Sequence, residues 1–325
     1  MDDYEPSDQE ILNYVQRGIE RGSAESQYAM GVLYIQGKGV EKSPVKALAW
    51  FRKAAEQGYA GAQFNLARML DQGVGTDISK DEATHWYMKA AEQGDAEAQF
   101  YVGGRFHQGL GVEQDFKQAA FWFEKASEQG LVIATSNLGV LYREGTGVGQ
   151  DPGRALELFE KAALKGDLRS QCSLGEMYLQ GEGTTKDPQK AIYWLEKAAH
   201  EGNMQAQFYL GTSYLSLEPP DMDKAIPWLE LASTGGQVDA QFNLGKIFFD
   251  GSGLNRDLHK ALSFFLLAAE QGDTEAQVYL GRIYFEGNGV ERDLYKSMEW
   301  FRKAAAQGDV ESKLNLERLQ ALLEV

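Results

Sequence analysis

A serine and a lysine three residues apart, in the first part of the chain, have the spacing of a catalytic motif. Ser43-Pro44-Val45-Lys46 matches Ser-x-x-Lys, the pattern in which enzymes that react with penicillins acylate the serine. Those enzymes also carry Lys-Thr-Gly and Ser-Asp-Asn, and neither tripeptide occurs in this sequence. The pattern leaves one enzymatic interpretation open, a penicillin-binding or hydrolase-like protein that uses Ser43.

Pairs of glycines separated by one residue resemble parts of phosphate-binding loops. A dinucleotide-binding fingerprint needs a strand before the glycines and a helix after them. The pairs in this chain follow segments with helical periodicity and recur at regular intervals, so we interpret them as turn glycines and expect no nucleotide cofactor. They are Gly37/Gly39, Gly73/Gly75, Gly109/Gly111, Gly145/Gly147, Gly181/Gly183, Gly251/Gly253 and Gly287/Gly289.

The histidines and the cysteine do not suggest a metal site or a nucleophile. His85, His107, His200 and His259 include no pair four residues apart, the spacing that places two ligands on one helix face. Cys172 has no base near it in the sequence, and no Ser-His-Asp or Cys-His arrangement can be argued. We expect no catalytic residue, no metal and no cofactor.

Composition limits the partners and the compartment. The 325 residues include 48 acids and 32 bases, a formal charge of −16, which repels nucleic acid and anionic lipid. A single cysteine suits a reducing compartment. Residues 1–6 do not resemble a signal peptide, and no apolar run approaches the roughly 20 residues of a membrane span. We expect a cytoplasmic protein, favour a monomer, and expect neither nucleic-acid binding nor membrane insertion.

The sequence repeats itself about every 36 residues. The recurring anchor residues are Gln27, Gln63, Gln99, Thr135, Gln171, Gln207, Gln241, Gln277 and Lys313. They define eight units, at residues 23–58, 59–94, 95–130, 131–166, 167–202, 203–236, 237–272 and 273–308. A capping helix within residues 1–22 precedes them and another within 309–325 follows them.

Each unit should contain two helices. In the third unit, Ala98, Val102, Gly103 and Phe106 form an apolar stripe at helical spacing, and a second stripe begins at Ala119. A residue able to cap a helix N-terminus precedes every second helix: Ser43, Ser79, Asp115, Asp151, Asp187, Asp221, Asp257 and Asp293. A glycine suited to a left-handed cap ends it: Gly58, Gly94, Gly130, Gly166, Gly202, Gly236, Gly272 and Gly308. Ser43 therefore occupies a capping position.

All six tryptophans fall at one place in the repeat: Trp50, Trp86, Trp122, Trp194, Trp228 and Trp300. A role repeated so regularly is structural, and we expect these rings to fill the seam between the two helices of a hairpin and its neighbour. Seven of the eight units have a glycine inside the first helix, which costs about 1 kcal/mol. A bulky ring from the second helix packed directly on that backbone would explain the glycine.

These residues resemble the Sel1-like repeat, a relative of the tetratricopeptide repeat. The pattern A-x-A-Q-x-x-L-G-x-x-Y-x-x-G-x-G-V, followed by D-x-x-K-A-x-x-W-F-x-K-A-A-x-Q-G, stands nearly whole in residues 273–308 and 22–58. The resemblance covers about residues 8–323. It implies an all-α, right-handed superhelical solenoid of stacked antiparallel helix hairpins, eight repeats with a terminal helix at each end. It also implies a non-catalytic adaptor that assembles proteins, including in bacterial host contact.

If the first helices line a concave groove, three positions per repeat should look into it and bind a protein or peptide partner. We expect the groove to centre on the second to fourth units, because aromatic and basic residues favour interfaces. The alternative is that several rings pack between adjacent first helices, and Arg105 could turn sideways. The candidates are Tyr28, Phe64, Arg68, Phe100, Arg105, His107, Arg143, Phe208, Phe242, Lys246 and Arg282.

Overall fold

The computed structural model describes residues 7–251 and 255–323, and the secondary structure of this part is entirely helical. It contains eighteen helices, so the predicted all-α solenoid of helix hairpins is confirmed. Residues 1–6, which bear on the expected absence of a signal peptide, and Gly253 of one glycine pair lie outside the described residues. The chain forms two compact units, one ending at Asp167 and the other beginning at Leu168.

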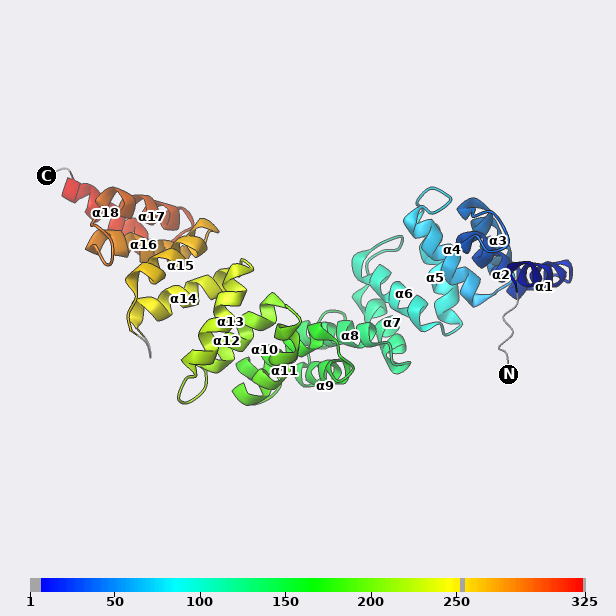
Figure 1. Ribbon diagram of the computed structural model, residues 1–325, viewed down its shortest axis with the longest axis horizontal. Coiled ribbons are helices and arrows are strands. Elements are labelled where there is room, and N and C mark those ends of the chain that lie inside the picture. The colour runs from blue at the N-terminus through cyan, green and yellow to red at the C-terminus, as the bar shows by residue number, and fades with distance from the viewer. Residues whose placement is uncertain (1–6, 252–254, 324–325) are drawn as a thin grey trace. The chain divides into compact units, whose positions relative to one another are not determined.

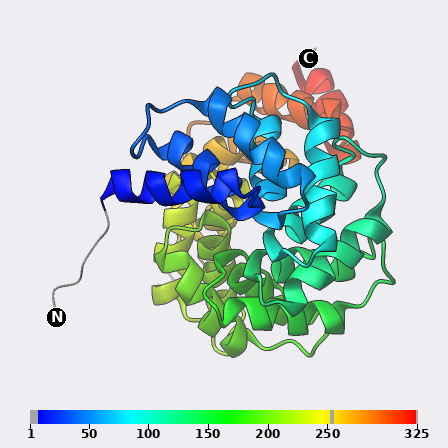
Figure 2. The same cartoon turned by 90° about the vertical axis from the view of Figure 1, so that its right-hand side faces the viewer.

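The first unit consists of a terminal helix and four hairpins. In both views α1 is its outermost helix, beside α2 (Figures 1 and 2). Each even-numbered helix begins a repeat and packs against the odd-numbered helix that follows it. The helices are α1 (Asp8–Glu20), α2 (Ala24–Gln36), α3 (Pro44–Glu56), α4 (Ala60–Gln72), α5 (Lys80–Glu92), α6 (Ala96–Gln108), α7 (Phe116–Glu128), α8 (Val132–Glu144) and α9 (Pro152–Ala163).

The second unit contains four further hairpins and a final helix. Its repeats follow the same order, with the even-numbered helix first (Figure 1). The helices are α10 (Leu168–Gln180), α11 (Pro188–His200), α12 (Met204–Leu215), α13 (Met222–Thr234), α14 (Val238–Asp250), α15 (Leu258–Glu270), α16 (Thr274–Glu286), α17 (Leu294–Ala306) and α18 (Val310–Leu323).

The second helices begin and end where their capping residues predict. Asp115 accepts hydrogen bonds from the backbone N–H groups of Lys117 and Gln118, at 2.9 and 3.1 Å. Ser43 Oγ accepts from the backbone N–H of Lys46 at 3.4 Å, while Nζ of Lys46 lies over the ring of Tyr34, 5.5 Å from its centre. All eight predicted residues are N-caps, although Ser79 makes no side-chain cap bond. The eight closing glycines have positive φ, as expected.

The ring that packs on the first-helix glycine is not the tryptophan but the residue after it. A Cβ atom at Gly103 would lie 2.7 Å from Cδ1 of Phe123, so only glycine allows this contact. Phe159 fills the same place against Gly139 and is 1% exposed. Trp122 is only half-buried and packs against the core that residues of α3–α6 form. The expected packing of a bulky second-helix side chain on the glycine is confirmed, and Trp122 packs against the neighbouring repeat, as expected.

The second glycine of several Gly-x-Gly pairs brings neighbouring repeats into close contact. A Cβ atom at Gly111 would collide with the backbone carbonyl of Lys80, in the first turn of the preceding second helix. At Gly147 it would collide with the carbonyl of Phe116. Both glycines have positive φ, 69° and 75°. These pairs are therefore turn glycines that also permit the contact between repeats.

The anchor glutamines join one repeat to the next, a role that the sequence did not reveal. Gln63 is buried; its amide donates to the carbonyl of Ala55 in the preceding repeat at 3.2 Å, and its Oε1 accepts from Gln93 at 2.7 Å. Gln99, Gln241 and Gln277 make the same pair of bonds. In the fourth repeat the hydroxyls of Thr135 and Ser127 replace this link, 2.8 Å apart.

Replacing Phe159 by Ala should lower the free energy of unfolding by about 3–5 kcal/mol, because a buried ring leaves a cavity against Gly139. Trp122→Ala, which truncates a half-buried ring, should cost less. Because contacts in a solenoid are between neighbours, increased hydrogen exchange should centre on α8 and α9. Urea unfolding and hydrogen exchange measure both effects. An equal or larger loss for Trp122→Ala would contradict the assignment of the seam to the phenylalanine.

Ser43→Asp should leave the stability within about 0.5 kcal/mol of the original, because aspartate caps helices as well as serine does. Six other repeats already have aspartate at this place. Ser43→Ala should cost about 1 kcal/mol, since it removes the cap. Incubation with a labelled penicillin tests the enzymatic alternative, and we expect no covalent label. A stable label at Ser43 that Ser43→Asp abolishes would establish the serine as a nucleophile.

Candidate partner-binding site

A recess lies between the first helices of the first two repeats. Its volume is about 360 Å³, and it belongs entirely to the first compact unit. Residues of α2 and α4 line it, together with a ring of α3 and a residue of the loop after α4. They are Tyr28, Val32, Ile35, Phe51, Asn65, Arg68, Met69, Gln72 and Val74.

Helical periodicity places these side chains around the recess. On α2 the lining residues recur at i, i+4 and i+7 (Tyr28, Val32 and Ile35), which is one face of a helix. On α4 they recur at i, i+3, i+4 and i+7 from Asn65. Phe51, whose ring packs on a first-helix glycine, and Met69 are almost fully buried, whereas Val32 and Ile35 are partly exposed. The apolar surface is therefore formed by the hairpin seam and two aliphatic side chains.

Polar groups lie at the Asn65 side of the recess. The amide of Asn65 donates to the hydroxyl of Tyr28 at 3.2 Å, which leaves the Tyr28 O–H proton able to donate. Arg68 is exposed, with its guanidinium over the ring of Phe64, 5.9 Å from the ring centre. The recess thus combines apolar walls with hydrogen-bond donors. This arrangement is typical of sites that bind an apolar group of a ligand together with a hydrogen-bond acceptor of the same ligand.

Of the residues that the sequence singled out, Tyr28 and Arg68 lie on the recess. Phe64 is 8% exposed and packs edge-on against Tyr87 and Tyr101, 5.6 and 5.7 Å between ring centres. Phe100 is half-buried beside Phe123. These two phenylalanines follow the alternative interpretation, in which rings pack between helices.

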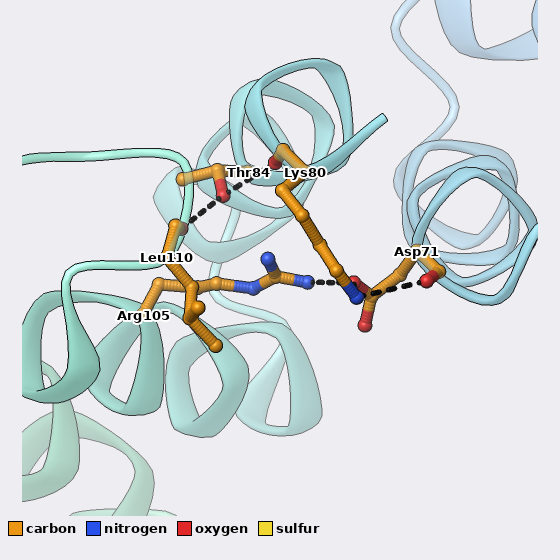
Figure 3. A network of polar contacts seen from close by, with 5 residues as sticks. All are labelled: Asp71, Lys80, Thr84, Arg105 and Leu110. Atoms are coloured by element: carbon orange, nitrogen blue, oxygen red, sulfur yellow. Dashed lines mark hydrogen bonds and ion pairs between the residues drawn. The ribbon is translucent and has the colours of Figure 1, made fainter. Parts of the chain in front are cut away.

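Arg105 is buried in a polar network between α4 and α6 (Figure 3). Its guanidinium pairs with Asp71 at 2.5 Å, and Asp71 also accepts from Lys80 at 2.6 Å. Burial of Asp71 by itself favours the neutral acid, but the hydrogen bonds from Lys80 and Arg105 outweigh it and lower the pKa of this carboxyl. Arg105 is 4% exposed, so its placement on a groove wall is corrected: it joins two repeats.

The remaining candidates are dispersed. In the first unit, His107 lies edge-on to Phe116 at 5.4 Å, and the carbonyl of Arg143 accepts from Gln150. In the second unit, Phe208 is half-buried beside Tyr209, and Lys246 lies over the ring of Phe242 at 5.7 Å. Arg282 is exposed and pairs with Glu311 at 2.7 Å. None of them lines the recess between α2 and α4.

The sequence did not indicate that Phe51 lines the recess. Phe51 belongs to a second helix, and only its packing on the first-helix glycine brings it to the recess. The repeat register was the available signal, since the residue after the tryptophan position is bulky and largely apolar in all eight units. Within residues 7–251 and 255–323, no group of three His, Cys, Asp or Glu side chains could hold a metal ion. In the same part of the chain, no helix has the length and hydropathy of a membrane span.

Comparison with known proteins agrees with this architecture. The structure resembles that of a protective antigen from uropathogenic Escherichia coli strains that displays an SLR fold, with 35% sequence identity and a TM-score of 0.83. The alignment covers 94% of this chain and 66% of the antigen's chain, so this chain spans less than two thirds of that relative. A Sel1 repeat protein from Oxalobacter formigenes has 27% identity and a TM-score of 0.70, over 97% of this chain and 94% of its own.

No curated protein sequence gives a significant match. The Sel1 repeat model matches eight segments of the chain, at residues 24–59, 60–95, 96–131, 132–167, 168–203, 205–237, 238–273 and 274–309. These segments follow the hairpins α2–α3 to α16–α17, and the eight repeats expected from the sequence are confirmed. The chain therefore belongs to the Sel1 repeat family.

Proposed function

We propose that this protein is a non-catalytic scaffold that holds a segment of a partner protein in the recess between α2 and α4. Repeat proteins of the Sel1 and tetratricopeptide kind generally mediate protein–protein interactions. The observation that carries the proposal is the open, largely apolar recess with donors at one side. The lone cysteine and the acidic surface favour a monomer in the cytoplasm that binds neither nucleic acid nor lipid.

The recess has the physical properties that a binding site for a side chain needs. A volume of about 360 Å³ lies at the lower end of the range for ligand pockets, about 300–1,000 Å³. Releasing poorly held water from the surfaces of Val32, Ile35 and Phe51 favours an apolar occupant. The walls are helices fixed by the glycine seam, so binding requires little ordering of the protein.

Adding charge to the recess should weaken partner binding without unfolding the protein. We expect Val32→Glu with Ile35→Glu to weaken binding at least tenfold, because a carboxylate in the recess would have to lose its water when an apolar side chain enters. The matched control is Lys53→Ala with Lys89→Ala, two exposed positions on the second helices. Affinity purification from the native host, followed by titration of the purified partner, gives both affinities.

Circular dichroism and urea unfolding must show that both variants remain folded. Loss of the partner by the lysine variant, with unchanged binding by the recess variant, would place the working surface on the second helices and contradict the proposal.

A further inference from the structure

We infer that the recess selects a segment in which an aliphatic side chain is followed, within about three residues, by an aspartate or glutamate side chain. The inference rests on the proposed function and specifies its ligand. The aliphatic group would enter between Val32 and Ile35, and the carboxylate would pair with Arg68.

Arg68 has the properties of a receptor for a carboxylate from outside the chain. It is exposed on the recess, and no carboxylate of the described residues lies within ion-pair distance of it. Two other arginines on the helices do have such a partner: Arg52 pairs with Glu82 and Arg282 pairs with Glu311. In a chain with a formal charge of −16, a base left unpaired beside an apolar recess favours an acidic ligand.

The acid nearest to Arg68 on its own helix is engaged elsewhere. Asp71 lies one turn further along α4, where it would be placed to pair with Arg68. It instead binds Lys80 and the buried guanidinium of Arg105 (Figure 3). Asp71 is thus paired within the network between the repeats, and no carboxylate of α4 pairs with Arg68.

The polar groups beside Arg68 favour the same ligand. Tyr28 accepts the amide proton of Asn65, so its own hydroxyl proton can be donated to a carboxylate or a backbone carbonyl. An arginine fork donates hydrogen bonds to both carboxylate oxygens at once, which adds geometric selectivity to the charge.

The surface beyond Arg68 favours a side-chain carboxylate over a chain terminus. Arg68 and Tyr101 contact the same ring, that of Phe64. Tyr101 is 37% exposed and stacks on Tyr87 with 4.9 Å between ring centres. A segment that continues past Arg68 therefore reaches a fixed aromatic surface, whereas a C-terminal carboxylate would end at Arg68.

The spacing follows from the geometry of helices and extended chains. Arg68 itself lines the recess, so its guanidinium lies close to an apolar side chain held there. An extended chain advances about 3.3 Å per residue, which places the carboxylate roughly one to three residues after the apolar side chain.

Synthetic peptides with acetylated and amidated ends test the inference, because blocked ends leave the side-chain carboxylate as the only anion. Each fluorescent nine-residue Gly/Ser peptide carries one Leu, and an Asp, Asn or Lys one, two or three residues after it. We expect the best Asp peptide to bind the wild-type protein at least tenfold more tightly than its Asn counterpart, in fluorescence anisotropy at low salt. Raising the salt should reduce this preference, since the ion pair is exposed.

Reversing the charge of the arginine should reverse the selectivity. Arg68→Glu should lose the Asp preference and bind the Lys peptide more tightly than the Asp peptide. Lys53→Glu, an equal change of charge at an exposed second-helix position, should keep the wild-type preference. This control separates pairing at Arg68 from a general effect of net charge.

The other outcomes distinguish this inference from the proposed function. If Asp and Asn peptides bind alike and Val32→Glu with Ile35→Glu abolishes both, the recess binds side chains but the carboxylate inference is wrong. If no peptide binds the wild-type protein, the inference is wrong as well. If the peptides bind the recess variant as tightly as the wild type, the proposed function at this recess fails too.

Discussion

The contact of a second-helix side chain with the bare backbone of a first-helix glycine holds each hairpin together. In most repeats the side chain is a phenylalanine, and a Cβ atom on the glycine would overlap it. The glycine destabilises its helix by about 1 kcal/mol, whereas burial of the ring contributes several times as much. The same contact forms part of the candidate site, because Phe51 packs on Gly31 and also lines the recess. The wall of the recess that the first repeat supplies is therefore held by the packing of its hairpin.

Two further interactions stack the hairpins within each unit. The anchor glutamine satisfies a carbonyl at the end of the preceding second helix, a group that a helix C-terminus leaves without an intrahelical partner. The second glycine of the loop allows the next repeat to touch the first turn of that helix. Both interactions are short-range, and the glycine leaves no room for a Cβ atom, so together they limit the separation of neighbouring repeats. That separation gives the recess its width.

The repeat register predicted the hairpins, the caps and the turn glycines, because each depends on residues close together in the sequence. It did not distinguish Trp122 from Phe123, since adjacent residues on one helix face share the same periodicity and only the packed structure shows which ring meets the glycine. The candidate site was predicted in part. Tyr28 and Arg68 line the recess, whereas the burial of Phe64 and Arg105 depends on partners from other repeats.

The ion pair of Arg105 connects the fold to the electrostatics of the site. A buried guanidinium must be neutralised, and Asp71 of the preceding repeat supplies the charge at 2.5 Å. Lys80 binds the same carboxylate, and together the two cations hold the pKa of Asp71 below its usual value, so it stays ionised at neutral pH. Asp71 thus pairs with both Lys80 and Arg105, and Arg68 on the same helix remains exposed to solvent. The contact between repeats thereby engages the carboxylate of Asp71 and leaves Arg68 without an ion pair beside the recess.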